Sequence, residues 1–133
     1  MSKIAASTSR VKKSILLFGV LLGLSTSAFA EGQFSKNCHG LELKLPYLHA
    51  SCKGIFNTVN RTRINLENYV GVQDGVLIWK RHGKLSTNAK LCSLVGINLG
   101  CAVLDANKKV HYSTINLDEH IGNLYGNLVY QGP

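Results

Sequence analysis

Short alternating runs of apolar and polar residues dominate the chain after residue 38. From Leu41 to Leu45 every second residue is leucine and the residues between are charged, a period-two pattern typical of a half-buried β-strand. Pro46 interrupts the run before a second apolar segment begins at Leu48, which indicates a hairpin. No helical pattern extends beyond a single turn. The predicted fold class is therefore all-β, built from short hairpins.

One segment of the sequence occurs twice, with an offset of 51 residues. Residues 64–79 read INLENYVGVQDGVLIW and residues 115–130 read INLDEHIGNLYGNLVY, so both glycines and most apolar positions are kept. Such self-similarity indicates one supersecondary unit built twice. We expect two repeats, at about residues 34–80 and 89–131, within a single domain.

Each copy predicts the same local structure. Asn65 or Asn116 caps one helical turn, and Glu119 stands where it can complete a reciprocal capping box with Asn116. A glycine then ends the turn, and a hairpin follows because Asp-Gly tolerates positive φ, with Tyr-Gly as a weaker signal. The predicted turns and strands are Asp74-Gly75 with Val76–Trp79, and Tyr125-Gly126 with Asn127–Tyr130.

The first 30 residues have the composition of a secretory signal. Four basic residues precede an apolar run from Ile15 to Leu24, and Ala28-Phe29-Ala30 gives a small-x-small cleavage pattern. The apolar run is short for a membrane span, which takes about 20 apolar residues. We therefore expect an exported protein, periplasmic or secreted, whose mature chain, residues 31–133, forms one domain.

All four cysteines lie in the mature part. Export allows disulfides, and an even count suits two bridges in a small domain. The duplication favours Cys38–Cys52 with Cys92–Cys101, although the spacing leaves the other two pairings open. These cysteines stand 14 and 9 residues apart, and no C-x-x-C or H-x-x-x-H spacing is present, so we expect neither a metal site nor a cofactor.

The charge of the mature domain argues against nucleic-acid binding. The chain carries 15 Lys and Arg against 7 acidic residues, but four of the basic residues belong to the leader, which leaves 11 against 7. The densest basic stretch, Lys80 to Lys90, follows the first repeat and is diluted by glycine, serine, threonine and asparagine. We interpret it as a solvated linker between the repeats.

Two histidines are the candidates for catalysis in a small, basic, exported hydrolase. General acid–base chemistry needs two titratable groups at one bond, and His111 and His120 could supply them. His120 falls on the apolar stripe of the second helical turn, where Tyr69 stands in the first copy, which favours a packed structural histidine. No G-x-S-x-G or H-E-x-x-H motif is present. We expect no enzymatic activity.

Over the whole mature chain, these features resemble the cyanovirin-N homology family of small lectins. The shared pattern is Phe34-Ser35 before Cys38, a 14-residue cysteine interval, and STINLDEHIGNLYGNLVY at residues 113–130. The resemblance implies a pseudo-symmetric fold of triple-stranded sheets and β-hairpins, with short helical turns, in which the two repeats exchange strands. It also implies two disulfides, in the pairing that the duplication favours.

The resemblance further implies binding of mannose-type glycans through a shallow site in each half. The site near the termini is formed in the family by the segment before the first cysteine, the segment after the second, and the loop of the last repeat. Lysine and asparagine side chains can hydrogen-bond sugar hydroxyls, and a tyrosine offers a ring face. The candidate carbohydrate-binding residues are Lys36, Asn37, Lys53, Asn123 and Tyr125, of which only Asn123 matches the family directly.

The second half carries a poorer candidate site. The interval between Cys92 and Cys101 indicates a shorter loop than in the family, the residues Ala102 to Leu104 are apolar, and Val72 replaces a polar residue. Apolar groups leave sugar hydroxyls without partners. We expect this half to be silent toward mannose.

Two interpretations of function stay open. One is a lectin for mannose-type or related glycans with one principal site near the termini. The other is a protein-binding or anionic-surface-binding module on the same fold that has lost its sugar site, because fold alone does not assign function. The segment from Lys80 to Gly83 replaces a proline-containing hinge of the family, so we expect a monomer in place of a domain-swapped dimer.

Overall fold

The computed structural model describes residues 32–132, so the expected signal sequence lies outside the described part. Antiparallel strands joined by short turns make up this domain, and none of its helices is long and apolar enough to cross a membrane. The strands are β1 (Cys38–Lys44), β2 (Tyr47–Lys53), β3 (Val59–Asn65), β4 (Val70–Gln73), β5 (Val76–Trp79), β6 (Ala89–Val95), β7 (Asn98–Leu104), β8 (Val110–Asn116), β9 (Ile121–Leu124) and β10 (Asn127–Tyr130). The helical turns are η3 (Phe34–Lys36), η4 (Ile55–Asn57), η5 (Leu66–Asn68), α3 (Leu85–Asn88) and η6 (Leu117–Glu119).

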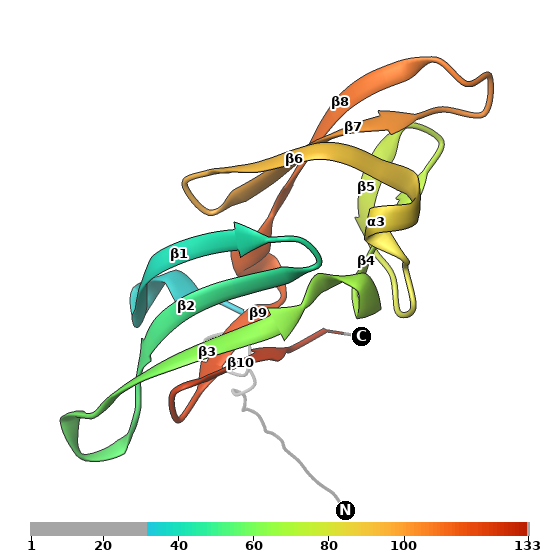
Figure 1. Cartoon of the computed structure of the whole chain (residues 1–133). Coiled ribbons are helices and arrows are strands. Elements are labelled where there is room, and N and C mark those ends of the chain that lie inside the picture. Colours follow the sequence, from blue (N-terminus) through green and yellow to red (C-terminus); the bar gives the residue numbers. More distant parts are fainter. Residues whose placement is uncertain (1–31, 133) are drawn as a thin grey trace, which may run out of the picture. The chain divides into compact units, whose positions relative to one another are not determined.

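The two repeats exchange hairpins, as the resemblance implied. Each repeat forms a three-stranded sheet, β1-β2-β3 or β6-β7-β8, and a separate hairpin, β4-β5 or β9-β10. The hairpin of each repeat packs on the sheet of the other, with β10 along β3 and β5 along β8 (Figure 1). Leu128 N donates to Thr62 Oγ1 at 3.2 Å, and Leu77 N to Ser113 Oγ at 2.9 Å. We call β1–β3 with β9–β10 the first half, and β6–β8 with β4–β5 the second half.

The helical turns show the predicted asparagine caps without a capping box. Asn65 Oδ1 accepts from Glu67 N, and Asn116 Oδ1 accepts from Asp118 N, both at 2.9 Å. The prediction for Glu119 is wrong, because its Oε1 accepts a hydrogen bond from Trp79 Nε1 at 3.0 Å. Each turn is a three-residue 3-10 helix, and the glycine expected to end it lies inside the following strand.

The segment that we interpreted as a solvated linker is partly a structural element of the second half. Leu85 in α3 is fully buried, as Phe34 is at the equivalent position 51 residues earlier. Lys84 N donates to Glu67 O at 2.9 Å, just as Gln33 N donates to Asp118 O at 2.8 Å. Residues 83–88 therefore repeat the entry segment of the first half, and only the stretch near Arg81 is exposed connection.

The second disulfide occupies a shifted position, and this corrects the expectation of a shorter loop. Strands β6 and β7 have seven residues each, as β1 and β2 do. In the first hairpin Cys38 pairs with Cys52 in register, whereas Ala89 and Val103 hold that place in the second. The second bridge, Cys92–Cys101, lies closer to the hairpin turn. The two cysteines are only 9 residues apart because their disulfide lies nearer the turn, and the hairpin itself is as long as the first one.

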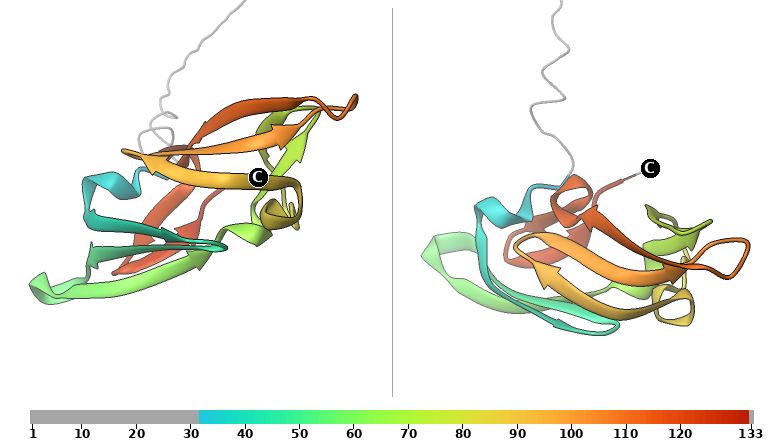
Figure 2. Two further views of the ribbon diagram at one scale, coloured as in Figure 1. Left: turned by 45° about the horizontal axis from the view of Figure 1, so that its top comes forward. Right: turned by 90° about the horizontal axis from the view of Figure 1, so that it is seen from above.

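A single apolar core runs through both halves and is itself duplicated. Its fully buried members include three pairs related by the 51-residue offset: Phe34 with Leu85, Leu48 with Leu99, and Leu66 with Leu117. Two further views show each hairpin lying against the sheet of the other repeat, which is how both halves share this core (Figure 2). The duplicated core places equivalent surface loops at the two far ends of the domain.

Candidate functional site

Backbone hydrogen bonds bring the predicted residues of the first half together. Asn37 follows η3, and its carbonyl oxygen accepts from Lys53 N at 2.9 Å, which fixes the segment before the first cysteine against the end of β2. Lys36, Asn37 and Lys53 are all exposed. Their side chains therefore point to solvent from a backbone frame that the disulfide Cys38–Cys52 holds directly beside them.

Asn123 acts mainly as a positioning residue in this site. Its Nδ2 donates to Lys53 O at 2.9 Å, and its Oδ1 accepts from Gly126 N at 2.7 Å. These bonds tie the β9–β10 turn to the end of β2. A carboxamide has a second N–H and a second lone pair, so Asn123 keeps one donor and one acceptor for a ligand.

Tyr125 presents its ring at the tip of the β9–β10 turn. Its backbone has φ 53°, and its side chain is 73% exposed. Gly126 follows, and a Cβ there would meet Gly54 Cα at 3.3 Å and Asn60 Cβ at 3.1 Å. Only glycine allows the turn to approach the β2–β3 connection so closely. The structure thus places Tyr125 beside the segment that begins at Lys53.

The β2–β3 connection adds two exposed apolar residues that the sequence analysis did not select. Ile55 is 56% exposed and Phe56 is 91% exposed, on the loop between Gly54 and Thr58. Burying a phenylalanine side chain would gain about 2 kcal/mol, so its full exposure leaves an apolar ring available to a ligand. A phenylalanine in a glycine- and asparagine-containing loop was the signal that could have identified it.

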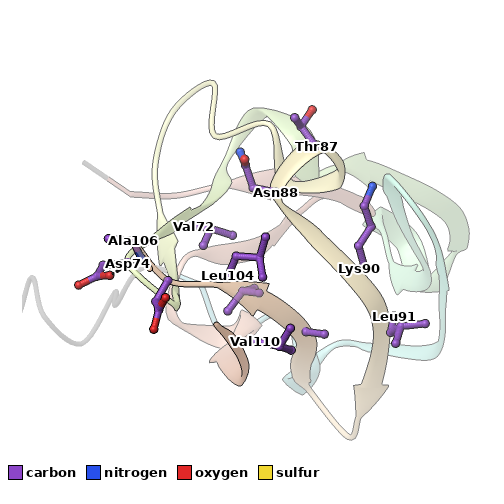
Figure 3. A pocket seen from close by; sticks show the side chains of 12 residues that line it. Val72, Asp74, Thr87, Asn88, Lys90, Leu91, Leu104, Ala106 and Val110 are labelled. Carbon is purple, nitrogen blue, oxygen red and sulfur yellow. Dashed lines mark hydrogen bonds between the residues drawn. The ribbon is translucent and has the colours of Figure 1, made fainter. Parts of the chain in front are cut away.

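In the second half the equivalent residues line a cavity of about 600 Å³. Each of the five predicted residues of the first half has an equivalent, 51 positions away in the sequence, that lines this cavity. Figure 3 shows Val72, Leu104 and Val110 between the two ends of this cavity, with Asp74 and Ala106 at one end and Lys90 and Leu91 at the other. The equivalent pairs are Lys36 with Thr87, Asn37 with Asn88, Lys53 with Leu104, Asn123 with Val72, and Tyr125 with Asp74.

Charged groups fix the walls of this cavity. Asp74 Oδ1 accepts from Ala106 N at 2.8 Å, which joins the β4–β5 turn to the β7–β8 loop. Asp105 Oδ1 accepts from the backbone N–H groups of Asn107 and Lys109, and its Oδ2 lies 2.7 Å from His111 Nε2. The hydrogen bond to His111 and the backbone N–H bonds lower the pKa of Asp105 below 3.8. The carboxylate is therefore ionised, and both of its oxygens already have hydrogen-bond partners within the chain.

The chemistry of the cavity floor is apolar, as expected, and the predicted residues Val72 and Ala102 to Leu104 all line it. The strand register places Leu104 where Lys53 lies in the first half, and Asp105 follows it as Gly54 follows Lys53. Val103 is almost completely buried. Polar side chains remain at the rim, at Asp74, Thr87, Asn88, Lys90 and Asp105. A sugar seated on this floor would leave several hydroxyls without partners.

The two histidines considered for catalysis have separate structural partners. His111 contacts Asp105, whereas His120 Nδ1 lies 3.0 Å from Gln131 O and its ring packs against Trp79 at 5.2 Å between centroids. His120 is thus part of an aromatic cluster with Trp79 and Tyr130. Within residues 32–132 no group of three or more His, Cys, Asp or Glu side chains could hold a metal ion.

Solved structures share this fold at low sequence identity. GzCVNH from Gibberella zeae is 23% identical, with 76% of this chain and 99% of that chain covered at a TM-score of 0.67. A MoCVNH3 variant in complex with (N-GlcNAc)4 is 20% identical, with 74% and 97% covered at a TM-score of 0.69. Microvirin, solved in complex with mannobiose, is 20% identical, with 74% and 98% covered at a TM-score of 0.63.

A family comparison agrees with the fold and covers both halves. The family model described as the CVNH domain matches residues 34–129, from η3 through β10. The match includes both three-stranded sheets, both exchanged hairpins and both disulfides. The chain therefore belongs to the CVNH family, the family of cyanovirin-N homologues.

Proposed function

We propose that this protein is a non-catalytic lectin that binds mannose-type or related neutral glycans, with its principal site in the first half. The observation that carries the proposal is the surface around the β9–β10 turn, where the backbone of the exposed Tyr125 approaches Gly54, next to Lys53, whose N–H donates to Asn37 O. Family membership supports a carbohydrate ligand. So do the sugars present in the MoCVNH3 and microvirin structures.

The residues of this surface match the two faces of a pyranose. The sugar hydroxyls can accept from the ammonium groups of Lys36 and Lys53 and pair with the amide of Asn37, while the C–H face packs on Tyr125. Each such hydrogen bond contributes about 1 kcal/mol net. The site is shallow and open, so we expect modest affinity for a single sugar chain.

One principal site implies monovalent binding. The second half has Leu104 and Val72 where the first half has Lys53 and Asn123, so it offers a mannose hydroxyl few partners. Linking two equal sites can raise avidity by about 10² to 10⁴. We therefore propose that a monomeric form of this protein binds glycans without that gain and does not cross-link them.

Export is part of the same proposal. The basic and apolar pattern of the first 30 residues predicts a cleaved leader, and two disulfides suit an oxidising compartment. We propose a periplasmic or secreted location, where glycans of cell surfaces are accessible.

Matched substitutions in the two halves test the site. Lys53→Met and Leu104→Met place the same side chain at equivalent positions, and Tyr125→Asn removes the ring while keeping a residue that tolerates positive φ. We expect Lys53→Met and Tyr125→Asn each to weaken binding of α-linked dimannose about tenfold, which corresponds to about 1.4 kcal/mol. Isothermal titration calorimetry measures this, after a glycan array has ranked the ligands.

Leu104→Met is the control and should leave the affinity for dimannose unchanged. A loss of binding in Leu104→Met without a loss in Lys53→Met would move the principal site to the second half, and equal losses would contradict a single principal site. No binding of any array glycan by the folded wild-type protein would overturn the lectin proposal.

A further inference from the structure

The outer face of the first sheet carries a row of cationic and aromatic side chains. In strands β2 and β3, buried residues such as Leu48, Ala50 and Ile64 alternate with residues that face solvent. The register places His49 opposite Arg63 and Ser51 opposite Arg61. We call this surface the basic face; its members are Glu42, Lys44, Tyr47, His49, Ser51, Arg61 and Arg63.

Contacts within the basic face orient both guanidinium groups. The Arg63 guanidinium lies over the ring of Tyr47, 4.1 Å from its centroid, and within the described residues it forms no ion pair. Arg61 donates to Gly40 O at 2.7 Å and lies 3.3 Å from Glu42 Oε1. Stacking holds the plane of Arg63 and leaves its N–H edge free, which is the geometry that guanidinium groups use for oxyanions.

The positive charge of the basic face is only partly compensated. Lys44, Arg61 and Arg63 give three positive charges, and Glu42 gives the one negative charge, shared between Lys44 at 3.8 Å and Arg61 at 3.3 Å. Exposed ion pairs of this kind contribute about 0 to 1 kcal/mol. A ligand anion can therefore replace Glu42 as the partner of either cation.

The equivalent face of the second sheet is uncharged. Tyr112 and Thr114 stand at the positions of Arg61 and Arg63, and the Tyr112 side chain lies over Gly100, which replaces His49. The remaining equivalents are Ser93, Val95, Asn98 and Ala102. The backbone is the same in both sheets, but only the first repeat carries these charged side chains. The fold therefore does not require the basic face.

We propose that the basic face binds sulfate or phosphate groups carried by an anionic polysaccharide. Successive outward residues on a strand stand about 7 Å apart, so Arg61 and Arg63 offer two guanidinium groups in line along β3. None of the members of the basic face is aliphatic, and the exposed Val59 lies beyond Arg61 at the end of β3, whereas surface binding to a membrane relies on apolar groups that enter the lipid. The proposal concerns a second surface and goes beyond the lectin site around Tyr125.

Charged and neutral forms of one polymer test the proposal directly. Binding of dextran sulfate, dextran phosphate and unmodified dextran to the mature protein is measured by calorimetry over a range of salt concentrations. We expect the charged dextrans to bind and neutral dextran not to bind. The double variant Arg61→Gln/Arg63→Gln should weaken binding at least tenfold and lower the slope of log K against log salt by about two, one for each lost cation.

The matched control is Tyr112→Gln/Thr114→Gln, which introduces the same two residues at the equivalent positions of the second sheet and should bind charged dextran as the wild type does. Preference for the sulfate or the phosphate polymer identifies the anionic group, and either result supports the proposal. Equal weakening in both double variants, no binding of either charged dextran, or binding only to vesicles that contain phosphatidylglycerol would overturn it. Dimannose binding by the Arg61→Gln/Arg63→Gln protein should be unchanged. If charged dextrans do not bind, the proposal for the basic face fails, and the lectin proposal is still tested separately by dimannose binding.

Discussion

The two halves of this domain share one backbone and differ in the chemistry of their outer ends. Both have a three-stranded sheet whose strands are seven residues long, a hairpin from the other repeat and an asparagine-capped turn. At the first end Lys53 and Tyr125 face solvent, whereas at the second end Leu104 and Asp74 line a cavity. Duplication therefore conserved what buries apolar surface and let the exposed positions diverge. Function in this fold has to be argued for each half separately.

Removing a core side chain from either half should have the largest effect. Phe34 and Leu85 are equivalent and fully buried, so Phe34→Ala should lower the free energy of unfolding by about 3 to 5 kcal/mol and Leu85→Ala by about 2 to 5 kcal/mol. Denaturant unfolding measures both. A negligible effect of Leu85→Ala would restore the interpretation of residues 80–90 as a plain linker.

Smaller and equal losses are expected where the exchanged hairpins are anchored. Thr62→Val and Ser113→Ala each remove the acceptor of a backbone N–H, from Leu128 and Leu77 respectively. Each should cost about 1 kcal/mol. The double variant should show the sum, because distant sites are additive to within a few tenths of a kcal/mol. A marked excess in the double variant would mean that the two anchors are coupled through the core.

Acid should reveal a difference that belongs to the second half alone. The pKa of Asp105 is lowered by its bonds to His111 and to backbone N–H groups, so its contribution to stability is present above pH 3.8 and is lost as the pH falls through the lowered value. Asp105→Asn should therefore be less stable than the wild type at neutral pH, and the gap should close in strong acid. Urea unfolding at both extremes measures the gap, and a gap independent of pH would contradict the assignment.

Transferring first-half residues to the cavity should produce the smallest effect. The double variant Val72→Asn/Leu104→Lys restores the equivalents of Asn123 and Lys53. We expect weak dimannose binding to appear in the second half, seen as new NMR shifts at Asn88, because two polar partners become available on an apolar floor. Persistent silence of the cavity would show that two polar partners are not sufficient without an aromatic ring at position 74, the equivalent of Tyr125.

The fold was predictable because duplication and burial act together. The period-two run at Leu41–Leu45 identified the β1–β2 hairpin, and the repeat of residues 64–79 at 115–130 identified the β4–β5 and β9–β10 hairpins, whereas β3 and β8 were not predicted. The exchange of hairpins between repeats came from the family resemblance, since no local pattern shows which sheet a hairpin covers. The place of Glu119 was missed for a related reason, because its partner Trp79 is 40 residues away and belongs to the other repeat.

The sequence analysis grouped three residues that the structure brings together, but it did not predict the bonds that hold them. Asn37, Lys53 and Asn123 do meet, yet the two hydrogen bonds that occupy Asn123 arise from the tertiary approach of Gly54 and Gly126. The apolar residues of the second end were predicted, but the cysteine spacing was wrongly interpreted as a shortened loop. The spacing recorded instead a disulfide placed nearer the turn of an unchanged hairpin.

The central claim is that sugar recognition belongs to the first half, and an NMR titration with α-linked dimannose tests it most directly. Amide signals of Asn37, Lys53 and Tyr125 are compared with those of their equivalents Asn88, Leu104 and Asp74 in one ¹⁵N-labelled sample. We predict saturable shifts in the first group and none in the second. Larger shifts around the cavity than around Tyr125 would contradict this account.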